Sequence, residues 1–292
     1  MPSGLEILQP DTLDEALELR AAHPGAAAIA GGTDLMVALN FDQARPPAVL
    51  DITRVPELTE WAPDGDRLRV GAGVTYTRLI DELGERLPGL AIASRTVGSV
   101  QIRNRGTVGG NLATASPAGD GLPPLYTSGA VVEVASVRGT RRLPVAEFVT
   151  GPKRTALEPD ELITAFSLPP AAGPQQFAKV GTRNAMVIAV CSVSLALWPE
   201  ARRVTTCVGS AGPMPLAADD ADAFIAGVLD EHDYWTTRAP LPDVALHRFG
   251  ELAGQAARPI DDVRGTAAYR RHAVGVLARR TLAWTWSEGA WA

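Results

Sequence analysis

The sequence is poor in cysteine, with Cys191 and Cys207 as its only two thiols among 292 residues. A structural zinc site or an iron–sulfur cluster needs about four protein ligands, most of them thiolates, close together in space. Two distant cysteines therefore exclude a cluster that this chain holds by itself. We interpret both as small apolar side chains on strands.

Long hydrophobic runs are also missing. The longest nearly uncharged apolar stretch, residues 186–198, is interrupted by Ser192 and Ser194. A membrane-spanning helix needs roughly 20 apolar residues, so this shorter stretch predicts a buried strand and no membrane span. The N-terminus has no basic flank followed by an apolar core, so no secretory signal is expected and the cytoplasm is the expected compartment.

Positive charge is not in excess, because 27 Lys and Arg residues face 33 Asp and Glu residues and the formal net charge is -6. A nucleic-acid groove is therefore not expected. The content of 46% hydrophobic and 21% charged residues is typical of a soluble globular protein. The chain also contains no internal repeat and no low-complexity tract.

The first part of the chain, residues 1–56, predicts a small α/β lobe. Thr12 and Glu15 form a capping-box pattern at the start of an apolar-faced helix. A strand is expected over residues 26–30 and a short helix over residues 34–40. A second strand is expected at residues 49–52.

The rest of the chain predicts two further α+β units, over residues 57–170 and 175–292, joined by the linker PPAAGP. The middle unit predicts strands over 67–74, 130–137 and 162–168, and helices over 75–83 and after Pro88. The last unit predicts an antiparallel strand pair across residues 199–203 and helices over 218–229 and 266–284.

Two glycine loops are the candidate binding elements. AIAGGTDL, residues 28–35, lies between an expected strand and an expected helix. A glycine pair alone is typical of a turn, but a helix that begins directly after it favours an anion at its N–H groups. In RNRGTVGGN, residues 103–111, glycines, a threonine hydroxyl and an asparagine amide predict a second anion nest. Two such loops could hold a diphosphate; the alternative is a pair of surface turns with solvated arginines.

A third glycine-containing stretch resembles the dinucleotide-binding fingerprint. It reads LRVGAGVTY, at residues 68–76. Tyr76 stands where that fingerprint has its third glycine. We therefore interpret the stretch as a strand that turns into a helix.

Five segments in order resemble the FAD-binding subunit of the molybdenum hydroxylases, the family of the flavin chains of xanthine dehydrogenase and carbon monoxide dehydrogenase. The segments are AIAGGTDL, RNRGTVGGNLATASPAGDGLPPL, GPKRTALEPDELITAFSLP, FAKVGTRNAM and DDVRGTAAYRRH. The resemblance extends from about residue 4 to residue 283. It implies an α+β fold of the vanillyl-alcohol-oxidase (PCMH) type, with two FAD-binding lobes and a C-terminal α+β domain.

The resemblance also implies which residues contact FAD. The first loop would wrap the diphosphate from one side, and residues 107–111 would wrap it from the other. Asp120 would contact a ribosyl or adenosine hydroxyl. Ile163 would pack against the cofactor. Where animal xanthine dehydrogenase has an aromatic side chain near the flavin ring, this sequence has Val97, so aromatic stacking is not carried over. The implied FAD-binding residues are Ala28, Ile29, Ala30, Gly31, Gly32, Thr33, Asp34, Leu35, Thr107, Val108, Gly109, Gly110, Asn111, Asp120, Ile163 and Lys179.

The function that the resemblance implies is electron transfer by a flavoprotein subunit of an oxidoreductase. A molybdopterin-binding large subunit and a 2Fe-2S small subunit are the implied partners, and NAD or oxygen is the implied acceptor. No catalytic acid or base and no metal site are expected on this chain. The alternatives are a free-standing flavoprotein oxidoreductase of the same superfamily and a non-catalytic assembly subunit without flavin.

The sequence also contains four histidines and a tryptophan-rich C-terminal end. His23, His232, His247 and His272 lie outside both glycine loops, and we expect each to be solvated. Trp284, Trp286 and Trp291 crowd the C-terminus. We expect these tryptophans either to contact a partner protein or to pack on the C-terminal unit.

Overall fold

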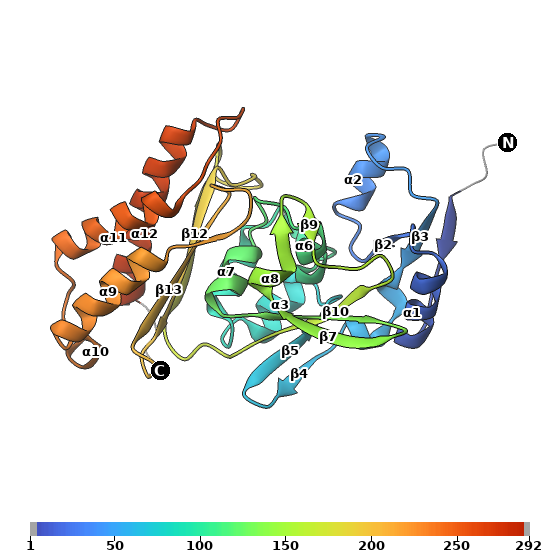
Figure 1. Ribbon diagram of the computed structural model, residues 1–292, viewed down its shortest axis with the longest axis horizontal. Helices are drawn as coiled ribbons and strands as arrows, with labels where there is room; N and C mark the ends of the chain where they lie inside the picture. The colour runs from blue at the N-terminus through green and yellow to red at the C-terminus, as the bar shows by residue number, and fades with distance from the viewer. Residues whose placement is uncertain (1–4, 289–292) are drawn as a thin grey trace.

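The computed structural model describes residues 5–288 and combines helices with three main β-sheets that follow one another along the molecule (Figure 1). The N-terminal sheet, the central sheet and the C-terminal sheet each carry their own helices (Figure 1). This arrangement confirms the α+β prediction.

The N-terminal lobe is a parallel three-stranded sheet in the order β1-β3-β2. Thr12 accepts the Glu15 N–H at 3.2 Å and so begins the first helix as predicted, whereas the Glu15 carboxylate accepts the N–H of Asp11 instead of that of Thr12. Ala135 and Leu162 of the central sheet belong to the core of this lobe, which ties the two parts together. Its elements are β1 (Glu6–Leu8), α1 (Leu13–Ala22), β2 (Ala27–Ile29), α2 (Leu35–Asn40), β3 (Ala48–Asp51), η1 (Ile52–Arg54) and η2 (Pro56–Leu58).

The central sheet is antiparallel, with the order β4-β5-β10-β6-β7, and a short β8-β9 ribbon lies beside it. As predicted, LRVGAGVTY is a strand that turns into a helix, because β5 ends at Gly71 and the Thr75 hydroxyl caps α3. The strands are β4 (Trp61–Asp64), β5 (Arg67–Gly71), β6 (Val131–Ser136), β7 (Gly139–Pro144), β8 (Val149–Gly151), β9 (Arg154–Thr155) and β10 (Leu162–Leu168). The helices are α3 (Tyr76–Leu83), α4 (Pro88–Arg95), α5 (Val100–Arg103), α6 (Val108–Thr114), α7 (Leu122–Thr127) and α8 (Val145–Phe148).

The C-terminal sheet is antiparallel, with the order β11-β12-β13-β14. The predicted pairing across residues 199–203 is confirmed, since β12 pairs with β13 from Ser192 opposite Gly209 to Trp198 opposite Arg203. Helix α11 has no counterpart among the elements predicted from the sequence. The elements are β11 (Gln175–Val180), β12 (Cys191–Trp198), β13 (Arg203–Gly209), β14 (Leu216–Ala217), α9 (Asp219–Glu231), α10 (Tyr234–Thr237), α11 (Asp243–Ala256) and α12 (Ala267–Glu288).

Strand β12 is buried on both faces along its whole length. Helix α12 packs on one face, while α4 and α7 of the central part also pack against this strand. Cys191 and Cys207 are buried free thiols, and burial raises the pKa of Cys191 to about 12. Both cysteines are therefore apolar packing residues, as predicted.

The C-terminal tryptophans divide between packing and exposure. Trp286 is buried, donates from Nε1 to the carbonyl of Ala239 at 2.8 Å and meets the Trp235 ring edge-on. Trp284 is 43% exposed, and Trp291 lies outside the described residues. Within residues 5–288, no helix is long and apolar enough to cross a membrane.

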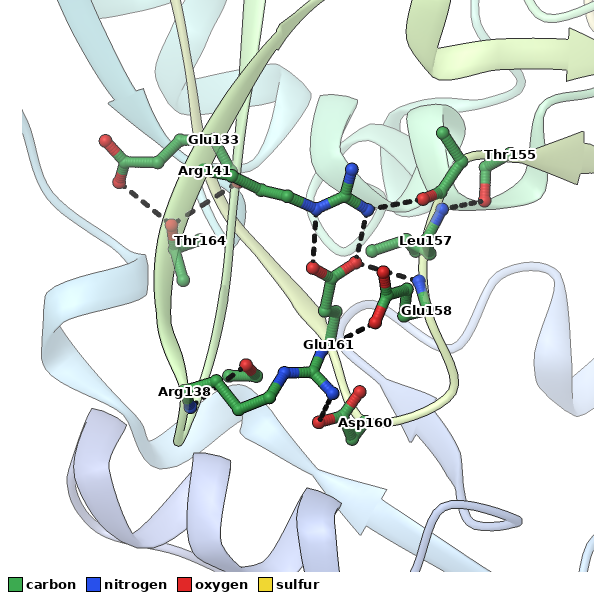
Figure 2. Close-up of polar contacts among 11 residues, drawn as sticks. Glu133, Arg138, Arg141, Thr155, Leu157, Glu158, Asp160, Glu161 and Thr164 are labelled. Atoms are coloured by element: carbon green, nitrogen blue, oxygen red, sulfur yellow. Dashed lines mark hydrogen bonds and ion pairs between the residues drawn. The ribbon is translucent and has the colours of Figure 1, made fainter.

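A buried carboxylate fixes the start of β10 (Figure 2). Glu161 is 4% exposed and accepts two hydrogen bonds from the Arg141 guanidinium, at 2.6 and 2.7 Å. The same carboxylate accepts the N–H of Glu158 at 2.8 Å. These bonds join the segment before β10 to β7, and the Arg141 hydrogen bonds lower the pKa of Glu161 below its ordinary value.

We expect Glu161→Gln to destabilise the fold by about 2 kcal/mol, because it weakens a charge-assisted pair and leaves Arg141 without its counter-ion. Since the folded pKa is lowered, this stabilisation is complete above the unfolded pKa near 4.3 and is lost as the pH falls. Urea unfolding at pH 7 and pH 4 measures both effects. The exposed pair of Glu158 with Arg138 provides the control: Glu158→Gln is expected to cost less than about 1 kcal/mol.

Candidate functional site

A cleft of about 520 Å³ lies between the N-terminal lobe, the central part and one loop of the C-terminal domain. This volume is in the usual range for a ligand or cofactor site. Most of the predicted residues line it. They are Ala28, Ile29, Ala30, Gly31, Gly32, Thr33, Asp34, Leu35, Thr107, Gly110, Asn111 and Asp120.

Four predicted residues do not form the cleft wall. Val108 and Gly109 are buried behind it, and an added Cβ on Gly109 would lie 2.4 Å from the Ala72 carbonyl oxygen. Ile163 is 6% exposed and belongs to the core of the central part. Lys179 is not in the cleft lining and contacts the lining residues Asp120 and Val187, so direct FAD contact by these four residues stays a prediction.

Each glycine of the pair in the first loop has its own structural reason: a close approach at Gly31 and a positive φ at Gly32. An added Cβ on Gly31 would lie 1.9 Å from the carbonyl oxygen of Arg105, so the two glycine loops touch at this point. Gly32 has φ +75°, a left-handed conformation that glycine adopts without strain. The pair therefore serves both the turn and the contact between lobes.

The first loop also offers unused hydrogen-bond donors to the cleft. Among residues 5–288, the N–H groups from Gly31 to Leu35 donate no hydrogen bond to another protein group. In the second loop, by contrast, the Gly110 N–H donates to the Thr107 hydroxyl at 2.9 Å. The N–H groups of Thr107 and Gly109 make no hydrogen bond among the described residues either, so both loops keep free donors, and Thr107 acts as the N-cap of α6.

A side-chain hydrogen bond connects Asp34 of the first loop with Thr114 on α6. The Thr114 hydroxyl on α6 lies 3.0 Å from Asp34 Oδ2 and 2.9 Å from the Gly110 carbonyl oxygen. Asp34 makes no side-chain cap bond to α2. Its carboxylate instead joins the N-terminal lobe to the central part.

A buried ion pair lies at the other end of the cleft. Lys179 Nζ on β11 lies 2.5 Å from Asp120 Oδ2, and both side chains are about one-tenth exposed. Nζ also donates to the carbonyls of Thr96 at 3.0 Å and Val187 at 3.2 Å. Burial raises the pKa of Asp120, and Lys179 acts against that shift.

Two buried acceptors in the cleft wall have no hydrogen-bond partner among residues 5–288. They are Asn111 Oδ1 and Asp120 Oδ1. Tyr76 lines the same cleft, and burial keeps its phenol neutral by raising its pKa far above the ordinary value. Since an unpaired buried acceptor is costly, this end of the cleft suits a ligand with hydroxyl or amino donors.

Part of the cleft wall is not predicted from the sequence. Tyr76, which breaks the false fingerprint, lines the cleft. Met186, Val187 and Ile188 belong to the stretch 186–198 that predicts a strand, but they lie in a loop before β12 and line the cleft. Val97 does line the cleft, where the Arg103 guanidinium holds its carbonyl at 3.1 Å. No local signal marks these side chains, because they reach the cleft only through tertiary packing.

No metal centre competes with this cleft in the part of the chain that the structure describes, where no three His, Cys, Asp or Glu residues gather as ligands. His232, His247 and His272 are exposed and His23 is half-buried, and none of the four lines the cleft.

Comparison with known proteins gives the same assignment for both halves of the chain. Residues 3–171 match the FAD binding domain in molybdopterin dehydrogenase, and residues 176–285 match the CO dehydrogenase flavoprotein C-terminal domain. The chain is 31% identical over 285 residues to the putative xanthine dehydrogenase FAD-binding subunit of Escherichia coli K12, with 93% of this chain and 92% of that protein covered.

Two further relatives cover almost the whole chain. The nicotine 6-hydroxylase medium subunit of Paenarthrobacter nicotinovorans is 30% identical over 281 residues, with 96% of each chain covered. A chain of the carbon monoxide dehydrogenase from Hydrogenophaga pseudoflava superposes with a TM-score of 0.88 at 26% identity, over 99% of this chain and all of that one. The chain therefore belongs to the family of FAD-binding flavoprotein subunits of the molybdopterin dehydrogenases.

Proposed function

We propose that FAD lies in the 520 Å³ cleft, with its diphosphate against the first glycine loop and its sugar hydroxyls toward Asn111 and Asp120. The observation that carries this proposal is the pairing of free N–H donors at one end with orphaned acceptors at the other. The ligand must then combine an anion with hydroxyl donors, as FAD does.

Each wall of the cleft has a distinct task in this proposal. The donors from Gly31 to Leu35 neutralise the diphosphate, and Gly110 leaves room for it because no side chain stands there. The Asp34–Thr114 contact holds the two lobes at a fixed separation. The bound flavin supplies the redox chemistry, while these residues set its position and its exposure to water.

We propose further that the chain receives electrons from iron–sulfur clusters on a small subunit and passes them to an acceptor such as NAD or oxygen. Molybdopterin would be held by a large subunit. The relatives named medium subunit and FAD-binding subunit support this assembly, as do the two cysteines, which are too few for a cluster. Cytoplasmic location and the division at residues 56 and 170–175 belong to the same proposal.

Reconstitution tests this function. The purified chain is expected to take up about one FAD and to hydroxylate no substrate alone; hydroxylation appears only when the molybdopterin and 2Fe-2S subunits are added. A chain that assembles with these subunits but takes up no FAD would support the non-catalytic alternative. Substrate turnover by the flavin-loaded chain alone would support the free-standing oxidoreductase.

A further inference from the structure

Arg270 is a buried cation whose contacts extend toward the cleft. It lies in DDVRGTAAYRRH on α12 and is 2% exposed. Its guanidinium pairs with Asp262, which also accepts two hydrogen bonds from the Arg264 guanidinium, at 2.7 and 3.1 Å. Nη1 of Arg270 donates to the carbonyl oxygen of Ser210 at 3.2 Å.

Ser210 in turn contacts both walls that flank the Asp120 end of the cleft. Its N–H donates to the carbonyl of Pro117 at 2.9 Å, and its hydroxyl donates to the carbonyl of Ala189 at 2.6 Å. Pro117 stands between the cleft residues Ser116 and Ala118, and Ala189 directly follows the cleft residue Ile188.

The backbone of Ser210 is suited to this double contact. Its φ is +57°, a left-handed conformation that a serine adopts only at a cost, and the residue is 4% exposed. This turn directs the N–H and the hydroxyl to two different loops. The bond from Arg270 to the Ser210 carbonyl then ties the turn to α12.

We infer that Ser210, held by Arg270 and Asp262, is a positioning residue for FAD: it sets the spacing between the loop at residues 116–120 and the loop at residues 186–188. The inference rests on the proposed FAD site and assigns the C-terminal domain a part in cofactor retention. By linkage, FAD bound in the cleft also stabilises the C-terminal domain.

Ser210→Gly tests this inference, because glycine keeps the left-handed backbone and the backbone N–H while it removes the hydroxymethyl side chain and its hydrogen bond. The dissociation constant for FAD, measured by titration of the full deflavinated chain, is expected to rise about tenfold, the equivalent of one lost hydrogen bond. The absorption spectrum of bound FAD is expected to shift, because the loops at residues 116–120 and 186–188 are no longer held at a fixed spacing around it. Arg270→Met, which can donate to neither Asp262 nor Ser210, is expected to act in the same direction.

The matched control is Thr285→Ala, which removes one buried hydroxyl bond, to the Thr281 carbonyl, elsewhere in the same domain. It is expected to lower the melting temperature without changing FAD affinity or spectrum. Equal FAD affinity in Ser210→Gly and in the natural chain would overturn the inference, as would an equal loss in Thr285→Ala. A natural chain that binds no FAD would instead contradict the proposed site itself.

Discussion

Replacing Gly110 by valine is expected to abolish FAD retention while the chain stays folded. An added Cβ on Gly110 would lie 3.2 Å from the Thr107 hydroxyl, and a shift of that hydroxyl by a few tenths of an ångström would make room for it. Gly110 lines the cleft, however, and a valine would occupy the volume of the cofactor. Valine also has a better helix propensity than glycine, so little stability is lost.

The measurement is the dissociation constant for FAD, which we expect to rise at least about a hundredfold. Gly227→Ala is the matched control: Gly227 lies in α9 with nothing within 4 Å of an added Cβ, and FAD binding should not change. Natural affinity in Gly110→Val would remove the second glycine loop from the site. Because Gly110 has no positive φ, the expected effect comes from the space that a side chain would fill and not from backbone strain.

Lys179→Met is expected to cost about 3–5 kcal/mol of unfolding free energy, because it leaves the Asp120 carboxylate buried without its cation. It also releases the carbonyls of Thr96 and Val187. FAD affinity should fall with stability, since Asp120 and Val187 both line the cleft.

Urea unfolding of the single and double variants separates the charge effect from packing. The Asp120→Asn and Lys179→Met double variant should recover much of the stability, because neither charge then remains buried. Arg54→Met, which breaks the exposed pair with Asp11, should cost less than about 1 kcal/mol. A Lys179→Met chain as stable as the natural one would mean that this ion pair does not hold the two domains together.

The sequence predicted the features that local chemistry determines. Thr12 and Thr75 begin helices because a hydroxyl beside free N–H groups satisfies them in any context. The glycine pair at Gly31 and Gly32 was found for the same reason, since a positive φ and a close approach both favour glycine. The antiparallel partners β12 and β13 followed from their alternating apolar pattern.

The sequence could not predict the features that depend on distant segments meeting. Tyr76 reaches the cleft because α3 starts beside the second glycine loop, where the Tyr76 N–H donates to the Gly106 carbonyl at 2.9 Å. The wall at residues 186–188 comes from the C-terminal domain, and its place depends on Lys179 and Ser210. Ser210 itself has a left-handed backbone that its neighbouring residues do not predict.

Amide hydrogen exchange with and without FAD tests the central claim most directly. The N–H groups from Gly31 to Leu35 have no protein acceptor among the described residues, so they should exchange fast in the deflavinated chain and slowly once FAD is bound. Protection of this segment, absent in Gly110→Val, is the predicted result. Fast exchange at residues 31–35 in the FAD-saturated chain would contradict the proposed diphosphate site.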